Sequence, residues 1–350
     1  MIYTDLYLCP LTKTILKENI MDDFKAGIIA NPLAGSGLKQ LKPIIQLAQQ
    51  PRYRNRVFFY ITNSVGDIAS VLRKAINEHK VKVLFIYGGD GTLHLVIDIL
   101  IYELQQKNIT EIPLIVTLGG GTMKAIHMWL GWKEKPIDIF KKVIDTPLDT
   151  LPQRKLQPLC VSLYNTEKKR AEVHYGFIFI IGAVNRVIEI YDKESHNVIG
   201  GLKHIFYGIT SALSGLPRSH RAILHQFKAR MTANHEPLPQ DQPLSAICSI
   251  TDSLIFGLTP LRGHRESNQF LCATYSIPAW LVVLMLPVVV RGSWVPRVDS
   301  FFNKPISHFS ITPETESTFF LDGEFYHHQP GEEITISLDP SSEIQMVSSF

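Results

Sequence analysis

Short apolar runs alternate with amphipathic stretches from about residue 25 to residue 144. Four of the runs predict β-strands because they are short and mostly apolar. They are Lys25–Ala30, Val57–Ile61, Val83–Tyr87 and Pro113–Thr117. The stretches between them have apolar residues at helical spacing and predict the helices Leu38–Gln50, Asp67–His79, Leu93–Gln106 and Thr122–Leu130. Strands that alternate with helices are typical of a parallel sheet covered by helices on both faces.

The second half of the chain has a different pattern, in which β-branched and aromatic runs are separated by turn residues. Such runs predict mostly antiparallel strands. They are Ala171–Ile181, Ala222–Met231, Ser245–Phe256, Phe270–Tyr275, Ser307–Ile311 and Glu333–Leu338, with a helix expected near Leu202–Leu213. We therefore predict an extension over residues 1–24, an α/β domain over 25–148 and a β-rich domain over 149–350. The last strand of the β-rich domain either stays in that domain or packs back on the first domain, and the sequence leaves both arrangements open.

The composition fits a folded protein of two domains. At 350 residues the chain is long for a single core, and 45% hydrophobic residues are typical of a globular protein. The net charge of +3 is small for this length, which argues against bulk nucleic-acid binding. A local basic patch that faces an anionic membrane stays compatible with this charge.

No segment of the sequence predicts export or a membrane span. Cys9, Cys160, Cys248 and Cys272 are far apart in the sequence, which argues against a zinc site or a disulfide framework and fits a reducing compartment. The N-terminus lacks the pattern of a signal peptide. The longest apolar run, Ala279–Val290, is shorter than the roughly 20 residues that span a bilayer. It is interpreted as a core helix or strand pair, with a lipid-facing surface as the alternative.

The most informative segment is Gly88-Gly89-Asp90-Gly91-Thr92, which follows a predicted buried strand and precedes a predicted helix. Glycine allows the backbone to pass close to a polyanion, and the N–H groups at a helix start favour negative charge. The expected ligand is therefore a phosphate. Asp90 is placed for Mg²⁺ or proton chemistry beside that phosphate.

Three further polar loops follow strands of the same predicted sheet. Asn31-Pro32 with Gly35 follows the first strand, Thr62 follows the second, and Gly119-Gly120-Gly121-Thr122 follows the fourth. Taken singly, the first is explained equally well by a turn, and the second is better explained by a helix N-cap. Three consecutive glycines are better explained by a close backbone approach. Because ligands bind beyond the carboxyl ends of parallel strands, the loops together indicate a phosphate or nucleotide site.

Near the C-terminus, Asp322-Gly323-Glu324 places two carboxylates around a glycine after an apolar run. Asp-Gly is a leading signal for a β-hairpin, so an ordinary turn explains these residues as well as a catalytic site does. From the residues alone, both interpretations stay open.

Taken in order, these segments resemble the diacylglycerol kinase catalytic-domain family, which includes bacterial lipid kinases, diacylglycerol kinases, sphingosine kinases and ceramide kinases. Phe179-Ile180-Ile181-Gly182-Ala183 and residues 201–207 are also similar to the opening of the family's second domain. The resemblance covers nearly all of the chain after about residue 25. It implies a Rossmann-like parallel α/β nucleotide domain, then a β-rich, sandwich-like lipid domain, with the active site in the cleft between them.

The resemblance also implies an activity. Members of the family transfer the γ-phosphoryl group of ATP to a lipid hydroxyl with Mg²⁺, so a diacylglycerol- or sphingosine-like acceptor is expected. The residues expected around the nucleotide are Asn31, Pro32, Gly35, Thr62, Gly88, Gly89, Asp90, Gly91, Thr92, Gly121 and Thr122. Glu324 is the expected proton acceptor, with Asp90 and Asp322 as further catalytic carboxylates. Asp90, with Asp149 near the domain joint, is expected to join a metal–water network.

Several positions depart from the family pattern. Leu95 stands where the family usually has glutamate, and Lys124-Ala125 stands where it commonly has Asn-Asp. Lys124 either pairs with phosphate or is a solvated helix residue, and the second interpretation is slightly favoured. His94 is similar to the residue found there in sphingosine kinases, although a lone histidine at a helix start is more often structural. No Asp-Gly stands near Asn268-Gln269, where bacterial members bind an additional Mg²⁺, so the presence of that ion stays open.

Three functions are compatible with the sequence. An active lipid kinase is favoured because the carboxylates Asp90, Asp322 and Glu324 are all present. A kinase of a soluble substrate is the first alternative, since the similar NAD kinases also carry a Gly-Gly-Asp-Gly motif. A catalytically weak member that binds lipid or nucleotide is the second alternative, suggested by Leu95 and Ala125. A dinucleotide-dependent oxidoreductase fits poorly, because no Gly-x-Gly-x-x-Gly opens the first helix.

The remaining predictions concern partners. ATP and a lipid substrate at a membrane surface are expected, without nucleic acid, and a homodimer stays open. We expect a cytoplasmic protein with peripheral membrane contact, and export without a cleaved signal is not excluded. Trp280, Leu281, Leu284 and Trp294 are expected to line the route of the acyl chain, because they lie in or beside the longest apolar run.

Overall fold

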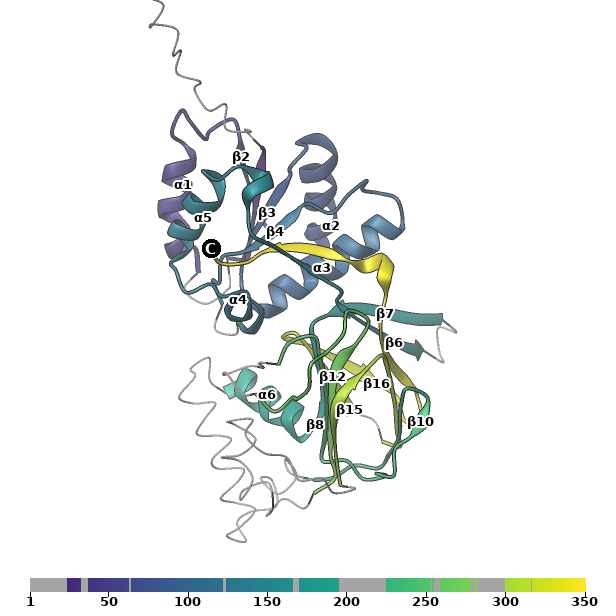
Figure 1. Cartoon of the computed structure of the whole chain (residues 1–350). Helices are drawn as coiled ribbons and strands as arrows, with labels where there is room; N and C mark the ends of the chain where they lie inside the picture. Colours follow the sequence, from purple (N-terminus) through teal and green to yellow (C-terminus); the bar gives the residue numbers. More distant parts are fainter. Residues whose placement is uncertain are drawn as a thin grey trace, which may run out of the picture.

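The structure, a computed structural model, describes residues 24–32, 37–62, 64–121, 124–165, 170–194, 225–252, 254, 259–277, 281, 300–315 and 317–350. These residues form two bodies, an α/β body at the top of Figure 1 and a body of antiparallel strands below it. The fold class predicted from the sequence is therefore confirmed. The domain boundary near residue 148 stays a prediction.

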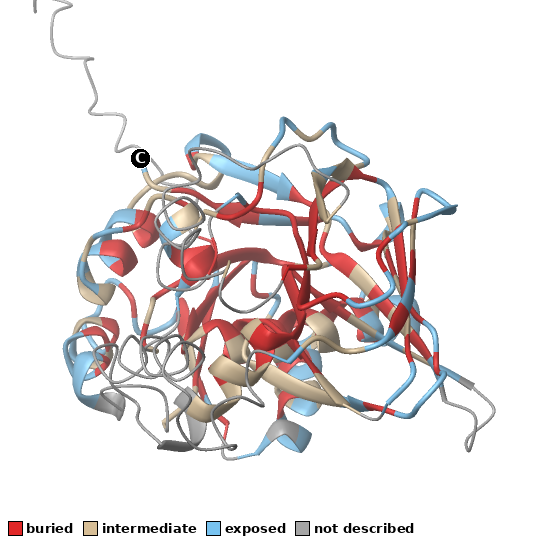
Figure 2. Ribbon diagram, turned by 90° about the horizontal axis from the view of Figure 1, so that it is seen from below, coloured by how far each residue is buried: buried red, intermediate tan, exposed pale blue. Residues whose placement is uncertain are grey.

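The first body contains a six-stranded sheet in the order β2-β1-β3-β4-β18-β5. Its strands are β1 (Ala26–Ala30), β2 (Val57–Ile61), β3 (Val83–Tyr87), β4 (Leu114–Thr117), β5 (Gln153–Leu156) and β18 (Ile344–Val347). All run parallel to their neighbours except β5, which is antiparallel to β18. Strands β1, β3 and β4 are fully buried. Figure 2 shows the buried segments of the molecule in red and the exposed segments in pale blue. Such strands can be apolar throughout because helices cover both faces of the sheet.

Four helices of this body lie in two pairs (Figure 1), with α1 beside α5 and α2 beside α3. The α-helices are α1 (Lys42–Ala48), α2 (Val65–Arg73), α3 (Asp90–Gln105), α4 (Ala125–Trp129) and α5 (Pro136–Ile144). Shorter helical turns are η1 (Gly37–Gln40), the π-helical η2 (Lys74–Glu78) and η3 (Leu148–Thr150). The prediction for the first helix was too long, because the chain forms η1 and then a new helix with Pro43 in its first turn. Helix α5, which Pro136 opens, was not predicted.

The second body contains two antiparallel six-stranded sheets, in the orders β10-β9-β14-β17-β6-β7 and β13-β12-β11-β8-β15-β16. Strands of the first are β6 (Leu159–Asn165), β7 (Arg170–Gly176), β9 (Ala229–Ala233), β10 (Glu236–Pro237), β14 (His308–Pro313) and β17 (Ile334–Leu338). Strands of the second are β8 (Ile178–Gly182), β11 (Ser245–Ser249), β12 (Phe270–Tyr275), β13 (Phe301–Ile306), β15 (Ser317–Leu321) and β16 (Glu324–His328). Helix α6 (Ala183–Glu194) follows β8, and the 3-10 turn η5 (Pro340–Ser342) follows β17.

One detail of the second body differs from the sequence prediction, and a second could not be predicted from the sequence. The single run Ala171–Ile181 forms β7 and β8, which belong to different sheets, because the chain changes sheet at Phe177. Cys248 and Cys272, far apart in the sequence, are cross-strand neighbours with free thiols whose sulfur atoms are 3.6 Å apart.

Several predicted features lie outside the described residues. They are the helix near residues 202–213, the family-like segment 201–207, and the proposed acyl-route residues Trp280, Leu284 and Trp294. Leu281 is described and packs partly buried against the core. Within the described part of the chain, no helix is both long and apolar enough to cross a membrane.

The chain ends in the sheet of the first body. Strand β18 pairs with β4 through Met346 and Ile115, after the chain has passed through the second body. The indole of Trp132 donates a hydrogen bond to the carbonyl of Val347 at 3.1 Å and holds this strand in place. Two chain segments therefore connect the bodies, one before β6 and one after β17.

Candidate active site between the two bodies

The segment Gly88-Gly89-Asp90-Gly91-Thr92 forms the turn between β3 and α3. Gly89 has extended backbone angles and precedes the helix, while Asp90 occupies the first helical position. Helix α3 thus begins three residues earlier than predicted. Its N-terminus lies at the carboxyl end of the parallel sheet, where N–H groups and the helix dipole favour an anion.

The third glycine loop packs directly on this turn. The N–H of Gly121 donates to the carbonyl of Gly88 at 3.1 Å. A Cβ atom at Gly121 would lie 2.3 Å from the Cα atom of Gly89, so a side chain at this position would push the two loops apart. Close approach of two backbones therefore explains Gly121, whereas Gly119 and Gly120 pack against the rings of His127 and Tyr87.

The loops after β1 and β2 are also joined to this turn. The side-chain amide of Asn31 donates to the hydroxyl of Thr92 at 3.1 Å, and Pro32 follows it. Thr62 is buried, and its backbone N–H and its hydroxyl both donate to the carbonyl of Ala30. Its hydroxyl hydrogen is thus used within the sheet, and the expected contact of Thr62 with a nucleotide stays a prediction. Gly35 and Thr122, also predicted to contact nucleotide, lie outside the described residues.

Asp90 is a buried carboxylate that connects two helices. It is 4% exposed, and its Oδ2 accepts a hydrogen bond from the N–H of Ala125 at 2.8 Å. Burial raises the pKa of Asp90 to about 6, and the N–H groups of Ala125 and Ile126 limit the rise. Ala125, which departs from the family pattern, thus supplies a backbone contact to the carboxylate. A nearby cation would further favour the charged form of Asp90.

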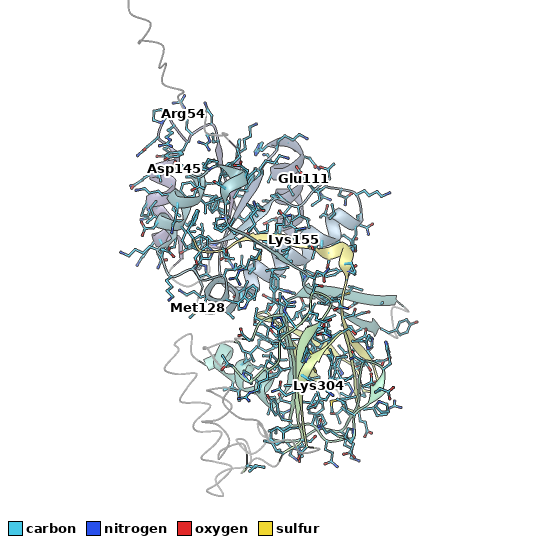
Figure 3. The ribbon with its side chains drawn as sticks, in the orientation of Figure 1. Arg54, Glu111, Met128, Asp145, Lys155 and Lys304 are labelled. Atoms are coloured by element: carbon cyan, nitrogen blue, oxygen red, sulfur yellow. The ribbon has the colours of Figure 1, made fainter. Side chains whose placement is uncertain are left out.

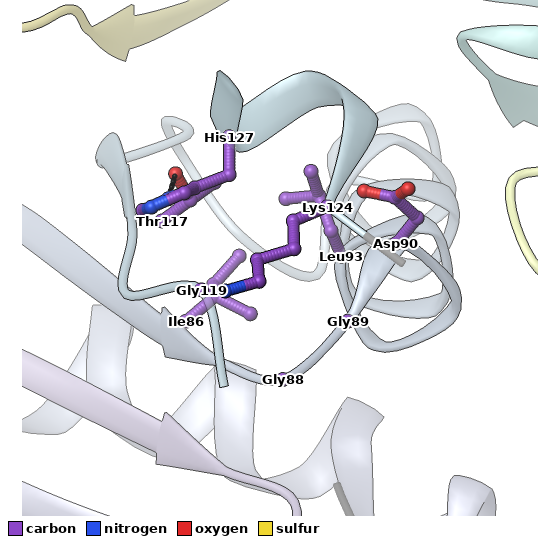
Figure 4. Close-up of a pocket in the computed structure, with 9 residues that line it drawn as sticks. All are labelled: Ile86, Gly88, Gly89, Asp90, Leu93, Thr117, Gly119, Lys124 and His127. Atoms are coloured by element: carbon purple, nitrogen blue, oxygen red, sulfur yellow. Dashed lines mark hydrogen bonds between the residues drawn. The ribbon is translucent and has the colours of Figure 1, made fainter. Parts of the chain in front are cut away.

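Figure 4 shows a small pocket between the glycine loops and α4. Its volume is about 10 Å³, and the side chain of Lys124 crosses it with the ammonium group close to Gly119. Lys124 is exposed and also lines this pocket, so both interpretations of its role stay open. In the same pocket the ring of His127 points to Thr117, with Nδ1 2.8 Å from the hydroxyl oxygen. Burial lowers the pKa of His127 to about 4, so the ring is neutral at pH 7.

Asp322 and Gly323 form the two-residue turn between β15 and β16, so the hairpin is present. Both have left-handed φ angles, 50° and 113°, as tight hairpin turns require. The turn packs on the start of α3, because a Cβ atom at Gly323 would lie 2.8 Å from the backbone nitrogen of Gly91. A Cβ atom at Gly91 would in turn lie 2.9 Å from Oε1 of Glu324. The turn thus brings the Glu324 carboxylate against the first turn of α3, next to Asp90.

Asp322 holds the backbone of the second body. Its Oδ2 and Oδ1 accept hydrogen bonds from the N–H groups of Phe177 and Ile178, at 2.5 and 2.8 Å. These N–H groups lie where the chain passes from β7 to β8. Burial raises the pKa of Asp322, and the charge of Asp90 raises it further. Both oxygens are engaged, so the geometry supports an anchoring role for Asp322 more directly than the catalytic role expected from the resemblance.

His94 links the two bodies behind the site. Its Nε2 lies 2.7 Å from the hydroxyl of Tyr326, and its Nδ1 lies 3.8 Å from Oδ2 of Asp322. The ring is fully buried, and this burial lowers the pKa of His94 to about 4. His94 lies one helical turn after Asp90, and Tyr326 lies two residues after Glu324. The pair therefore fixes the position of β16 relative to α3.

A second link lies one turn further along α3. Asp98 accepts a hydrogen bond from the N–H of Tyr175 at 2.8 Å, and its other oxygen is 3.1 Å from Nδ1 of His174. The His174 ring packs against the ring of Tyr326, with centroids 4.3 Å apart. The sequence analysis missed these residues. One signal was available, because Asp90, His94 and Asp98 are spaced by four residues and share one face of the helix.

The described residues offer Mg²⁺ few protein ligands. No group of three or more His, Cys, Asp or Glu side chains in the described part of the chain is arranged to hold a metal ion. Asp149 is exposed in η3 and, among the described residues, has no hydrogen bond to Asp90. Mg²⁺ in kinases is commonly held by one or two carboxylates together with substrate phosphates. Asp90 is compatible with such a site.

Comparison with known protein families gives one match, which covers the N-terminal part of the chain. The model of the diacylglycerol kinase catalytic domain matches residues 25–152. A search among curated protein sequences finds no match.

Solved structures share the fold along most of the chain. One of a proposed diacylglycerol kinase from Bacillus anthracis has a TM-score of 0.63 at 15% identity, and covers 93% of this chain and 97% of that one. A further diacylglycerol kinase structure from the same organism has a TM-score of 0.58 at 13% identity, with the same coverage. Yeast NADH kinase complexed with NADH has a TM-score of 0.50 at 12% identity, covering 94% of this chain and 84% of that one. At such identities the likeness concerns the fold.

Proposed function

We propose that this protein, whose residues 25–152 match the model of the diacylglycerol kinase catalytic domain, transfers the γ-phosphoryl group of ATP to a lipid hydroxyl. The observation that carries the proposal is the contact of the Glu324 carboxylate with the first turn of α3, beside Asp90. A phosphate at the helix N-terminus and a hydroxyl at Glu324 would thus be neighbours.

The first body supplies the nucleotide side of this reaction. The glycine turn after β3, with the Asn31–Thr92 contact at its edge, offers backbone N–H groups to the phosphates. The ammonium group of Lys124 lies between the glycine loops, where it would bind the phosphate charge. Asp90 would hold Mg²⁺ with the phosphates of ATP. When bound, this ion neutralises phosphate charge and orients the transferred group.

The second body supplies the proton acceptor. The oxygen of the lipid hydroxyl forms the new bond to the γ-phosphorus, while the bond from this phosphorus to ADP breaks. Glu324 accepts the hydroxyl proton. Such a base contributes roughly 10²- to 10⁴-fold to the rate if it lies within hydrogen-bond reach. Phosphoryl transfer depends mainly on positioning and charge, so the contact between Glu324 and α3 is the central requirement.

Other residues keep the two sides together. Asp322 holds the hairpin on the Phe177–Ile178 backbone, and the His94–Tyr326 pair ties β16 to α3. In this proposal Asp322, His94 and Tyr326 are positioning residues, since none of them is required to touch the lipid or ATP. The family match favours a lipid acceptor reached by peripheral membrane contact. A soluble dinucleotide acceptor is the competing proposal.

The test is Mg²⁺-dependent transfer of γ-³²P from ATP. The acceptors are diacylglycerol, sphingosine, ceramide, monoacylglycerol and phosphatidylglycerol in mixed micelles, with NAD and NADH in parallel reactions. We expect label in one lipid, and none with Glu324→Gln. Label in NAD or NADH alone would overturn the lipid proposal. No label anywhere, with ATP still bound in calorimetry, would indicate a protein that binds without turnover.

A further inference from the structure

A second, larger cavity lies between the two bodies. Its volume is about 340 Å³. From the first body it is lined by Trp129, at the end of α4, and Figure 3 shows the neighbouring Met128 at the edge that faces the second body. From the second body it is lined by Ile250, Asp252, Gly263, His264, Arg265, Glu266, Ser267 and Leu271. None of these residues belongs to the nucleotide side described above.

The cavity lies along the same sheet edge as the Glu324 hairpin. The N–H of Ile250 donates to the carbonyl of Phe177 at 3.1 Å, and the N–H of Phe177 donates to Asp322. The strand order β15-β8-β11-β12 places Leu271, on β12, three strands from the hairpin. Neighbouring strands are about 4.8 Å apart, so the cavity begins about 10 Å from the hairpin and reaches about 14 Å. The cavity thus lies within about 14 Å of the hairpin, on the side of the sheet end where the chain passes from β7 to β8.

Arg265 brings a positive charge to the wall of the cavity. It is half-buried, and its Nη1 donates to the carbonyl of Gln269 at 3.3 Å. Among the described residues no ion pair of Arg265 is found, although the exposed carboxylates of Asp252 and Glu266 also line the cavity. Burial lowers the pKa of Arg265, which fits a cation without a nearby counter-charge. A guanidinium has five N–H donors, so most remain available to an anion.

We propose that this cavity binds the headgroup of the acceptor lipid and that Arg265 binds a phosphate group in that headgroup. The acceptor is then a phospholipid that carries both a phosphodiester and a free hydroxyl, rather than a neutral diacylglycerol. This inference rests on the proposed kinase activity and names its substrate class. The planar guanidinium matches two phosphate oxygens, and Trp129, Ile250 and Leu271 cover the carbon atoms of the headgroup.

ATP is the other source of phosphate near this site. Its phosphates are expected at the start of α3 and at Lys124, both in the first body. Arg265 belongs to the second body and lies on the far side of β8 and β11 from the hairpin. The geometry therefore favours the acceptor, and the experiment below separates the two sources.

The first experiment compares two acceptors with identical acyl chains, phosphatidylglycerol and diacylglycerol. We expect Arg265→Gln to raise the KM for phosphatidylglycerol by about 10- to 100-fold, which corresponds to the loss of a charge-assisted hydrogen bond. The KM for ATP and any weak transfer to diacylglycerol should stay as in the wild-type protein, and Arg265→Lys should restore part of the loss. The matched control is Arg230→Gln, at an exposed position on the other sheet. Equal KM increases for both lipids, or a higher KM for ATP, would overturn the proposal.

The second experiment needs no turnover. The soluble headgroup glycerophosphoglycerol is titrated calorimetrically into the wild-type protein and Arg265→Gln, with inorganic phosphate and glycerol as comparison ligands. Headgroup binding that weakens in the variant supports the subsite even if no lipid is labelled, in which case only the kinase proposal fails. Equally tight binding of inorganic phosphate would overturn the headgroup assignment. So would headgroup binding that is unchanged in the variant, or undetectable in the wild-type protein.

Discussion

The nucleotide side and the acceptor side of the proposed site differ in how the chain builds them. In the first body, the described loops that contribute to it all follow strands of one parallel sheet. In the second body, Glu324 and Arg265 come from turns on different strands of an antiparallel sheet. Parallel strands collect their loops at one edge, so sequence order there predicts proximity. Antiparallel strands send alternate turns to opposite edges, so proximity depends on the pairing order.

The buried carboxylates sharpen this contrast. Asp90 accepts a hydrogen bond from Ala125, so it connects α3 and α4 within the first body. Asp322 accepts two from Phe177 and Ile178, so it connects the hairpin to β8 within the second body. The hydrogen bonds of each of these two side chains thus stay within one body, although Asp322 also lies 3.8 Å from His94 of the first body. Contacts that cross between the bodies include those of Gly91 with the hairpin, of His94 with Tyr326, and of Asp98 with His174 and Tyr175. The two halves of the site are thus built separately and joined along α3.

The largest effect is expected at the junction. Glu324→Gln removes the proton acceptor while keeping the side-chain shape, so kcat should fall about 10²- to 10⁴-fold with the KM for ATP unchanged. Steady-state kinetics with the labelled lipid measures both values. The exposed Glu314, also in the second body, provides the matched control Glu314→Gln. A wild-type kcat in Glu324→Gln would remove this residue from the mechanism.

The next largest effect is expected for Asp322, and it distinguishes a role in holding the backbone from a role in catalysis. Asp322→Ala leaves the buried N–H groups of Phe177 and Ile178 without acceptors, so the free energy of unfolding should fall by about 2–4 kcal/mol. Urea denaturation measures this loss. Asp241→Ala, at an exposed position of the second body, should leave the stability unchanged. Normal stability in Asp322→Ala, together with lost turnover, would show that Asp322 is catalytic rather than anchoring.

A pH-dependent effect is expected at the link between the bodies. The pKa of His94 is about 4 in the folded protein and about 6.5 in an unfolded chain, so stability is lost as the pH falls from about 6.5 to 4. Asp90 acts in the opposite sense, because its raised pKa makes stability fall as the pH rises toward about 6. His94→Gln removes only the first contribution. The loss of unfolding free energy between pH 7 and pH 5 should become about 2 kcal/mol smaller.

Urea denaturation at both pH values tests this expectation. The exposed His225→Gln is the control and should behave as the wild-type protein does. An unchanged pH dependence in His94→Gln would mean that burial does not hold this ring neutral.

The smallest effect is expected on the nucleotide side. Lys124→Met removes one positive charge from the phosphate pocket and should raise the KM for ATP about 10-fold, with a smaller effect on kcat. Lys133→Met, at an exposed position after α4, is the control. If the two variants have the same KM for ATP, Lys124 does not bind phosphate and is a solvated residue, which is the interpretation that the sequence slightly favoured.

Much of the nucleotide side could be predicted from the sequence. The strands β1 to β4, the glycine turns and the helix after Gly88-Gly89 follow from apolar periodicity and turn chemistry within a few residues. The Asp322-Gly323 hairpin follows for the same reason. The contacts between residues that are distant in the sequence could not be predicted in this way. His94 and Tyr326 are separated by 232 positions, and Phe177 and Asp322 by 145.

The sequence by itself thus determined the two kinds of sheet, the phosphate-binding turns and the residue types that carry the chemistry. These properties depend on local backbone preferences and on the spacing of apolar side chains. Only the tertiary structure decided that Glu324 lies at the start of α3, that Lys124 points between the glycine loops, and that Arg265 shares a cavity with Trp129. Such contacts depend on how buried surfaces fit together, and short-range patterns in the chain do not encode that fit.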